Sequence, residues 1–221
     1  MLVKEITINN LLPDVFKGTE ESSQIQKSRI WEAPPFIFKT GCKICIRAES
    51  GGGKSSLISF IFGNRNDYSG EILFNNRNIR SFSISDWCDI RRNSLALLPQ
   101  EMRLFPELSV IENIQLKNSL THHKTDGQID EMLDILDILE KKFSPVSKLS
   151  IGQQQRVALV RTLCQPFDFI LLDEPVSHLD EKNNRIVANL VENEAKQKNA
   201  GIITTSVGNH LLLDNPEFVN L

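Results

Sequence analysis

The sequence predicts an α/β fold with a mainly parallel sheet, and two features of its 221 residues support that prediction. The first is an alternation of expected helices and apolar strands in the C-terminal part, over 153–164, 167–172, 181–197 and 201–205. The second is a glycine cluster between an expected strand that ends at Ala48 and an apolar helix that begins at Ser55. Strands that alternate with helices favour one sheet in which the strands run parallel.

The N-terminal half of the sequence predicts shorter elements. Residues 2–8 alternate apolar and polar side chains, as in a half-buried strand, and residues 36–48 indicate a strand, a turn and a second strand. Residues 70–80 predict a hairpin with an Asn-rich turn. The polar stretch 17–27 has the composition of a loop, and we expect a mobile insertion there. Residues 107–143 are expected to be largely helical and to form a second, helical lobe.

Composition and charge exclude some classes of protein. The chain has 25 Lys and Arg against 28 Asp and Glu, a formal charge of −3 and a pI of about 5.9. Since no basic surplus is available to neutralise a phosphate backbone, nucleic acid is not an expected partner. Apolar residues make up 40% and charged residues 24%, as in ordinary globular proteins. At roughly 150 residues per domain, the length predicts one large domain or two small lobes.

The sequence also bears on location and redox environment. No apolar run approaches the roughly 18 residues that a membrane-spanning helix requires. The N-terminus lacks the pattern of a secretory signal, so we expect a cytoplasmic protein. Four cysteines, at 42, 45, 88 and 164, suit a reducing compartment. Cys42 and Cys45 form a lone CxxC pair, which we interpret as two buried strand cysteines, because no second pair completes a set of four metal ligands.

The glycine cluster has the sequence of a phosphate-binding loop, Ala-Glu-Ser-Gly-Gly-Gly-Lys-Ser over 48–55. Backbone amides of such a loop turn toward phosphate oxygens at a helix N-terminus, the lysine reaches the terminal phosphates, and the serine hydroxyl can bind Mg²⁺. A Gly-rich turn with a solvated lysine is the alternative, and the flanking strand and helix favour nucleotide binding. The residues expected to hold the nucleotide phosphates are Ser50, Gly51, Gly52, Gly53, Lys54, Ser55 and Ser56.

A pair of acids follows the apolar strand that begins at Phe169. Asp173, at the end of the strand, is expected to hold Mg²⁺ near the nucleotide. Glu174, one residue further, leaves the strand and is expected to polarise the water that attacks the γ-phosphate. The alternative is that the two acids only cap the end of a strand. The phosphate-binding loop in the same chain favours the catalytic interpretation over this alternative.

With these motifs in place, the chain resembles the ATP-binding subunits of ABC transporters over roughly residues 36–206. The order of the motifs makes the resemblance specific. After the phosphate-binding loop come Leu98-Pro-Gln100, then Leu149-Ser-Ile-Gly-Gln-Gln-Gln-Arg156, and then Leu172-Asp-Glu-Pro-Val-Ser-His-Leu-Asp180. These segments are similar to the glutamine loop of the family, to its LSGGQ signature, and to its Walker B strand running into the D-loop.

The resemblance implies a P-loop NTPase core of the ABC ATPase type, with a mainly parallel sheet, an antiparallel N-terminal β part and a small helical subdomain. A single domain over 1–221 would comprise a nucleotide-binding core lobe, 1–100 and 157–221, and a helical signature subdomain, 101–156. The implied cofactors are ATP and Mg²⁺. The implied partners are a second ATP-binding subunit, identical or related, and membrane-spanning transporter subunits. ATP-driven closure of the dimer would drive transport from the inner face of the cell membrane.

The resemblance also assigns roles to residues of the later motifs. Gln100 is expected to contact Mg²⁺ or the attacking water and to report the γ-phosphate to the helical lobe. Ser150, Gly152 and Gln153 are expected to contact nucleotide bound on the other subunit, because Ser150 and the Gly152 backbone open a helix and form an anion site. Asp180, at the end of the D-loop, belongs to the same nucleotide-contacting set. For the signature taken alone, an ordinary helix cap is the alternative.

Two apolar contacts complete the expectations. The family stacks adenine on an aromatic residue of the N-terminal region, for which Phe16 is the first choice and Trp31 the second. The segment 102–108, next to Gln100, is expected to form the groove that takes a coupling helix from a membrane subunit. Leu104 and Phe105 offer apolar contact there, and local packing of the lobe is the alternative.

Three departures from the family pattern bear on activity. Ala48 stands where the phosphate-binding loop normally begins with Gly, which is tolerable unless the position needs a positive φ. Ile151 adds bulk beside the signature serine. Ser206 stands where the family has a His that contacts the γ-phosphate, and a neutral hydroxyl predicts slower hydrolysis. His210 is a weak substitute for that His, and His178 is expected to be a variable surface residue.

A second function therefore competes with the ATPase. A nucleotide-gated clamp would dimerise on ATP, hydrolyse it slowly, and act as a structural or regulatory element of a membrane complex. The departures at 151 and 206 favour the clamp, whereas the carboxylate pair and the glutamine favour the enzyme. Chromosome-maintenance ATPases of the same family are not expected, because no heptad array separates the phosphate-binding loop from the signature.

Overall fold

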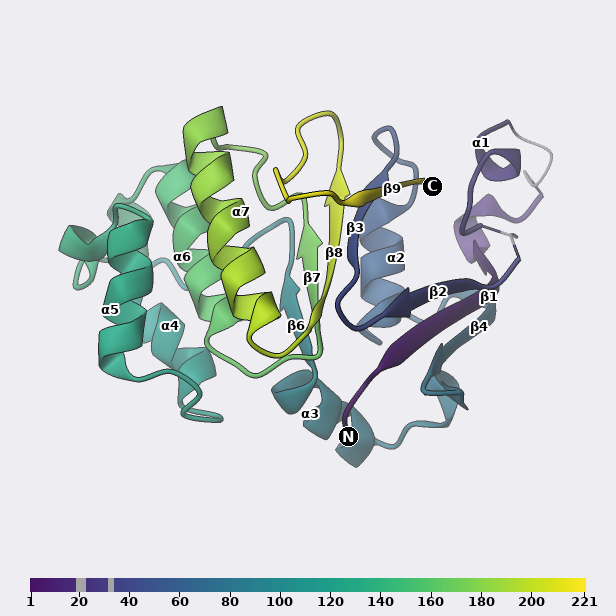
Figure 1. Cartoon of the computed structure of the whole chain (residues 1–221), viewed down its shortest axis with the longest axis horizontal. Coiled ribbons are helices and arrows are strands. Elements are labelled where there is room, and N and C mark those ends of the chain that lie inside the picture. The colour runs from purple at the N-terminus through teal and green to yellow at the C-terminus, as the bar shows by residue number, and fades with distance from the viewer. Residues whose placement is uncertain (19–22, 32–33) are drawn as a thin grey trace.

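The computed structural model describes residues 1–18, 23–31 and 34–221, and in this part of the chain the strands form two sheets (Figure 1). The larger sheet has the strand order β6-β7-β8-β3-β9, and every neighbouring pair in it is parallel. Its strands are β6 (Leu95–Leu98), β7 (Phe169–Asp173), β8 (Gly201–Ser206), β3 (Lys43–Arg47) and β9 (Glu217–Asn220). The predicted α/β class with a mainly parallel sheet is confirmed.

The second sheet is the antiparallel N-terminal part, with the order β2-β1-β4-β5. Its strands are β1 (Glu5–Pro13), β2 (Phe36–Lys39), β4 (Tyr68–Phe74) and β5 (Arg77–Asn78). Asn75 and Asn76 form the expected hairpin turn, and both have a positive φ, which Asn tolerates better than most residues. The stretch 17–27, expected to be a loop, contains a short helix, α1 (Ser23–Gln26), and residues 19–22 lie outside the described part.

Helices cover both faces of the parallel sheet (Figure 1). Helix α2 (Lys54–Ile61) lies on one face, and α6 (Ile151–Leu163) and α7 (Glu181–Lys196) lie on the other. Side chains of β7 divide between these layers. Phe169 and Leu171 pack in the same cluster as α2, whereas Ile170 and Leu172 pack with α6 and α7. Because both faces are covered, all five residues of β7 are buried. The sheet therefore presents the C-terminal end of each strand as an edge where loops can gather.

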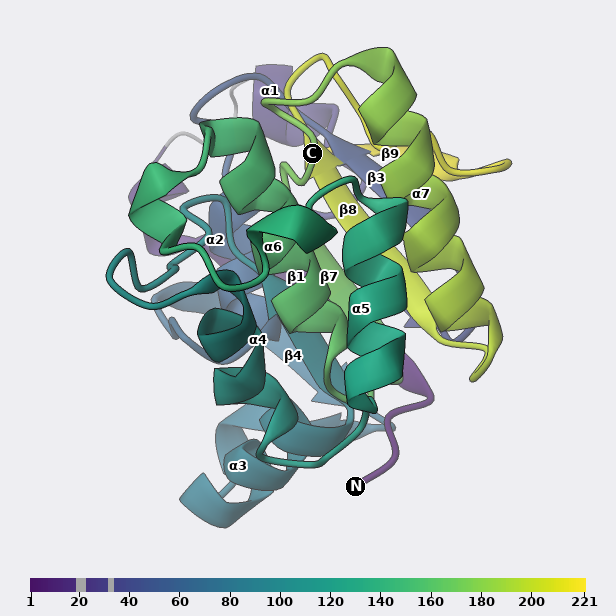
Figure 2. The same ribbon diagram turned by 90° about the vertical axis from the view of Figure 1, so that its left-hand side faces the viewer.

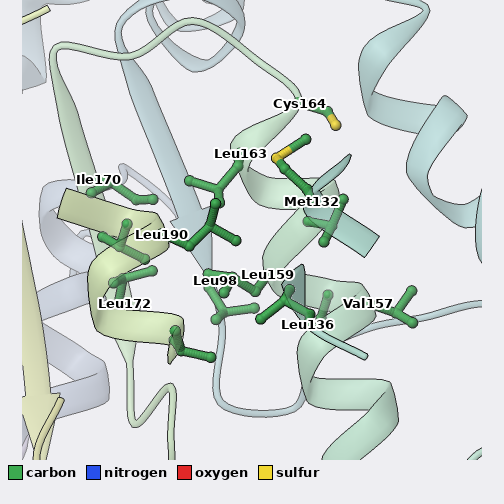
Figure 3. Packing of buried hydrophobic residues seen from close by; sticks show 14 of the residues in the cluster. Leu98, Met132, Leu136, Val157, Leu159, Leu163, Cys164, Ile170, Leu172 and Leu190 are labelled. Carbon is green, nitrogen blue, oxygen red and sulfur yellow. The ribbon is translucent and has the colours of Figure 1, made fainter. Parts of the chain in front are cut away.

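The helical region lies beyond α6, on the side away from the antiparallel sheet (Figures 1 and 2). It contains α4 (Val110–Asn118) and α5 (Asp126–Ile135), which confirms the helical prediction for 107–143. Figure 3 shows Met132 and Leu136 of this region packed with Leu98, Leu159 and Leu163 in one cluster. Burial of these apolar side chains fixes α6 against the parallel sheet. Helix α6 thereby connects the helical region to the edge of the sheet.

The N-termini of α4, α5 and α6 share one device, a capping box. Ser109, Thr125 and Ser150 each accept a hydrogen bond from the backbone N–H three residues on, and the side chain at that position accepts one in return. Such caps contribute about 1 kcal/mol each. The signature motif therefore does form an ordinary helix cap within this chain.

Some features differ from the expectations or add to them. Helix α3 (Ile84–Asn93) and strands β6 and β9 were not expected. Cys45 is buried in β3, but Cys42 lies half-buried in the turn before that strand, where burial raises the pKa of its thiol to about 11. Among the described residues, no three His, Cys, Asp or Glu side chains are grouped as metal ligands. Within the same part of the chain, no helix has the length and apolar character to span a membrane.

Candidate functional site

The phosphate-binding loop connects β3, which ends at Arg47, to α2, which begins at Lys54. Gly51 has φ +82° and Gly53 has φ +89°, in the left-handed region that favours glycine. A Cβ atom at Gly53 would lie 2.9 Å from Cζ2 of Trp31, so the close approach of the indole also requires glycine there. Gly53 is the N-cap of α2 and supplies no side-chain cap, which leaves the first N–H groups of the helix to an anion.

Lys54 is held in place by the loop and by the carboxylate opposite. Its Nζ donates to the carbonyl oxygens of Ala48, at 3.1 Å, and Glu49, at 2.9 Å, and lies 3.8 Å from Oε1 of Glu174. The side chain is only 5% exposed. Burial lowers the pKa of Lys54, and the negative charges of Glu174 and Asp173 oppose that shift. The first departure is harmless to the backbone, because Ala48 does not have a positive φ and serves through its carbonyl.

The two acids lie where β7 ends. Asp173 is buried, and its Oδ1 accepts a hydrogen bond of 2.6 Å from the hydroxyl of Thr205. Glu174 has φ +51°, an uncommon conformation for a residue with a side chain, which costs on the order of 1 kcal/mol. Its Oε2 accepts a hydrogen bond of 3.3 Å from Nε2 of Gln100. With this backbone conformation, the Glu174 side chain leaves the strand and contacts Gln100 and Lys54.

Lys54, Gln100 and Glu174 border one small cavity of about 220 Å³. Its lining residues are Ser50, Gly51, Gly53, Lys54, Ser55, Ser56, Gln100 and Glu174. Six of the seven residues predicted to hold the phosphates are therefore in one place with the predicted catalytic carboxylate and the glutamine. The cavity combines a helix N-terminus, an ammonium group and a carboxylate, which suits a polyphosphate and a water that attacks it.

Of the three residues predicted to hold Mg²⁺, Ser55 and Gln100 line this cavity, whereas Asp173 is buried at the end of β7 and does not line it. Ser55 offers a hydroxyl, Gln100 an amide oxygen and Asp173 a carboxylate, and Mg²⁺ prefers hard oxygen ligands completed by water and substrate phosphates. The Thr205 hydroxyl fixes one carboxylate oxygen of Asp173 and so orients the other. The chemistry of the donor set therefore fits the metal.

Two aromatic residues lie against the loop in different ways. Trp31 is 1% exposed, and its Nε1 donates to the carbonyl oxygen of Gly52 over 3.4 Å, so it supports the loop from below. Phe16 is half-buried and packs edge-to-face against Trp31, with ring centroids 6.3 Å apart. Because the indole is enclosed, Phe16 remains the candidate for adenine stacking.

The signature residues lie apart from this cavity. Ser150 is exposed at the start of α6, where its Oγ accepts from the N–H of Gln153 over 3.3 Å. Ile151 is 54% exposed beside it. A Cβ atom at Gly152 would lie 3.1 Å from the carbonyl oxygen of His178, so glycine lets the D-loop approach the helix. Asp180, also exposed, caps α7 by accepting from the N–H of Asn183 over 2.8 Å. None of these four predicted contacts, Ser150, Gly152, Gln153 and Asp180, lines the cavity of Lys54.

Ser206 ends β8 and is 2% exposed. Its Oγ lies 3.6 Å from Sγ of Cys45, and it borders a separate hollow of about 880 Å³ with Arg47 and His210. Contact between Ser206 and a γ-phosphate therefore stays a prediction. The ring of His210 packs perpendicular to that of Phe218, with centroids 5.2 Å apart, and His178 is exposed.

Two residues at this site were missed in the sequence. Thr205 lies opposite Asp173 in the parallel pairing of β7 and β8, a register that no local pattern reveals. Gln155 is buried in α6 and contacts the turn that contains Glu174. It lies within the quoted signature segment, and the apolar neighbours that follow it are the one local sign that it faces inward.

Comparisons with known proteins agree with this geometry. The sequence profile of the family described as "ABC transporter" matches residues 34–177. The chain is 32% identical to the lipoprotein-releasing system ATP-binding protein LolD of Treponema denticola over 174 residues, which cover 77% of this chain and 76% of that protein. It is 31% identical over 172 residues to the probable ABC transporter ATP-binding protein PEB1C of Campylobacter jejuni, covering 76% and 70%.

Solved structures support the fold. The dimeric structure of MJ0796, a bacterial ABC transporter cassette, matches with a TM-score of 0.75 and 22% identity over 91% of this chain and 87% of that one. A post-hydrolysis dimer of the same cassette with ADP and Pi matches with a TM-score of 0.70 and 24% identity, covering 80% and 79%. The chain belongs to the ABC transporter family. Within that family it is an ATP-binding subunit and an ATPase.

Proposed function

We propose that this chain binds Mg-ATP in the cavity between the phosphate-binding loop and Glu174, and that it works as one half of a dimer attached to membrane-spanning subunits. The observation that carries the proposal is the convergence of Lys54, Gln100 and Glu174 on that cavity. Closure of the dimer on ATP would drive transport by the membrane subunits, from the inner face of the membrane.

The chemistry follows from the groups that line the cavity. The N–H groups at the start of α2 and the ammonium group of Lys54 bind the phosphates and stabilise the charge that develops on them. Glu174 accepts a proton from water as the water oxygen attacks the γ-phosphorus. The bond from that phosphorus to the bridging oxygen breaks, and ADP leaves with phosphate. Gln100 holds the Glu174 carboxylate over the cavity by the hydrogen bond of 3.3 Å.

We further propose that Ser55, Gln100 and Asp173 hold Mg²⁺. The metal would neutralise charge on the phosphates and so favour attack by water. Phe16 is the proposed contact for adenine, at the edge of the loop that Trp31 supports.

The second half of each site would come from another subunit. Ser150 is exposed at the start of α6, and neither it nor Gly152 nor Gln153 lines the cavity of Lys54. We propose that they, with Asp180, contact nucleotide bound to the partner, which is a second copy or a related chain. The dimeric form of the related cassette structure supports this arrangement.

The proposed contact with the membrane subunit lies between the two lobes, 1–100 with 157–221 and 101–156. Phe105 is 53% exposed there, and a groove of about 330 Å³ beside it is also lined by Leu116 and Leu97. Leu104, in contrast, packs partly against the helical core. An apolar helix of a partner could dock at Phe105.

Family membership favours the ATPase over the hydrolysis-poor clamp. The test is phosphate release by the purified chain at saturating ATP, with Mg²⁺ or with EDTA, and with Glu174→Gln as the matched variant. We expect turnover that needs Mg²⁺ and that falls by about a hundredfold or more in Glu174→Gln, since the variant lacks the proton acceptor. ATP binding by that variant should persist. Turnover that is indifferent to Glu174→Gln would overturn the proposed mechanism.

A further inference from the structure

The backbone of Glu174 is held on both sides by buried side chains. Its N–H donates to Oγ1 of Thr205 over 3.1 Å, and its carbonyl oxygen accepts from Nε2 of Gln155 over 3.2 Å. Thr205 and Gln155 come from opposite directions, one from the adjacent strand β8 and the other from helix α6. Both side chains are buried. The two hydrogen bonds therefore fix the peptide planes before and after the Glu174 Cα atom.

Fixing both planes fixes φ and ψ, and these angles set the direction of the Cα–Cβ bond. Glu174 needs such support, because its φ of +51° lies in a region that a glutamate adopts only when its surroundings impose it. The carboxylate that results contacts Gln100 and Lys54 across the cavity. A change in either hydrogen bond would turn the carboxylate away from the position where it can accept a proton from water.

The two supporting residues have different second contacts. The Thr205 hydroxyl also donates to Oδ1 of Asp173, so one side chain orients both acids. The Gln155 side chain instead contacts the following turn, donating to Oγ of Ser177 over 3.3 Å and accepting from the N–H of His178 over 3.3 Å. Gln155 thus holds the turn, and Thr205 holds the acids.

We propose that Thr205 and Gln155 are positioning residues for Glu174, which act through its main chain and not by touching the nucleotide. The inference rests on the proposed role of Glu174 as proton acceptor. It makes two distinct predictions, because Thr205 alone also contacts Asp173. Loss of the Thr205 hydroxyl should lower the catalytic rate and raise the Mg²⁺ concentration that is needed. Loss of the Gln155 amide should lower the rate alone.

The experiment measures single-turnover conversion of bound ATP to ADP by the full chain, over a range of Mg²⁺ concentrations. Thr205→Val has the shape of the native side chain without its hydroxyl, and Thr205→Ser keeps the hydroxyl. Gln155→Met removes the amide, and Ser177→Ala removes the other acceptor of that amide while leaving Glu174 in contact. Each variant is made in the wild type and in the Glu174→Gln background, with ATP affinity measured by calorimetry.

We expect Thr205→Val and Gln155→Met to lower the rate by about tenfold or more, because misplacing a reacting group by an ångström has effects of that order. ATP affinity should change by less than about threefold, since neither side chain lines the cavity. Thr205→Ser and Ser177→Ala should stay within about threefold of the wild-type rate. In the Glu174→Gln background and at saturating Mg²⁺, the two disruptive changes should not lower the rate further, because their effect on the rate acts through the carboxylate that is already gone. Thr205→Val should still raise the Mg²⁺ concentration that is needed, since its hydrogen bond to Asp173 does not involve Glu174.

Equal losses with and without Glu174 would overturn the inference, since they would mean a general structural role. Wild-type rates in both Thr205→Val and Gln155→Met would also overturn it. Failure of the proposed function itself has a different signature, in which Glu174→Gln turns over ATP as fast as the wild type does. In that case Glu174 is not the proton acceptor, the measurements in the Glu174→Gln background have no meaning for any variant, and the positioning role is wrong as well.

Discussion

Two helix N-termini of this molecule are proposed to contact nucleotide, and they are built in different ways. Helix α2 begins at Lys54 inside a cavity that also contains Gln100 and Glu174, and Lys54 is nearly buried. Helix α6 begins at an exposed surface, where Ser150 and Gln153 cap each other. The start of α2 has no side-chain cap, so its N–H groups are left for a ligand of this chain. The start of α6 is capped by its own side chains. We propose that it contacts nucleotide only when another molecule brings the nucleotide.

The two helix starts therefore predict different effects of substitutions on ATP binding by one chain and on dimerisation of two chains. Removing the ammonium group at the start of α2 should strongly weaken nucleotide binding by the single chain. Changing a side chain at the start of α6 should leave that binding intact and alter only the ATP-dependent dimerisation. Three substitutions test this division, in order of decreasing expected effect.

The largest effect is expected for Lys54→Ala. Its ammonium group is the one that would meet the terminal phosphates, and a hydrogen bond to a charged group contributes about 1.5–3 kcal/mol. We therefore expect ATP affinity, measured by calorimetry, to fall by about a hundredfold. Lys39→Ala, an exposed lysine on β2, is the control and should bind ATP as the wild type does. Equal ATP affinity of the Lys54 variant and this control would show that the nucleotide does not bind at the phosphate-binding loop.

The second effect is expected for Ser150→Asp. Aspartate caps a helix as well as serine does, so the fold should persist, but its charge would repel a phosphate brought by a partner. We expect ATP-dependent dimerisation to weaken by about tenfold or more, while ATP affinity of the monomer stays unchanged. Thr125→Asp is the matched control, because Thr125 caps α5 with a glutamine at the same third position. Weaker binding of ATP by the Ser150→Asp monomer would break the division between the two helix starts.

The smallest effect is expected for Ile151→Ala. The isoleucine is exposed beside Ser150. In the proposed dimer its bulk would lie between the signature and the nucleotide of the partner. Alanine removes that bulk and is a better helix former, so α6 should be retained. We expect dimerisation with ATP to tighten by about twofold to threefold in sedimentation measurements, a few tenths of a kcal/mol. A looser dimer would mean that Ile151 makes a favourable contact with the partner.

Local motifs were enough to find the parts of the site that lie close together in the sequence. The phosphate-binding loop follows one strand directly, and Asp173 and Glu174 follow another, so their positions at one edge of the sheet could be predicted. The residues that hold Asp173 and Glu174 in place could not be predicted from local motifs. Thr205 is adjacent to Asp173 only because β7 and β8 pair in a particular register, which depends on the whole sheet.

Burial bears on the choice between the two aromatic candidates for adenine and favours Phe16. Phe16 and Trp31 were both candidates for adenine, and only the fold places the indole beneath the glycines of the loop. Strand β9 escaped prediction for a related reason, since it is short and two of its four residues are polar or charged. Its place is fixed by pairing with β3 and not by its own sequence.

The central claim is that this chain holds one half of each nucleotide site and needs a second chain for the other half. Light scattering of Glu174→Gln with and without ATP tests it most directly, because the variant should bind ATP without consuming it. We predict that the mass of Glu174→Gln doubles when ATP is added. The double variant Glu174→Gln with Ser150→Asp should keep the mass of a monomer. A monomer at every ATP concentration that saturates the cavity would contradict the claim.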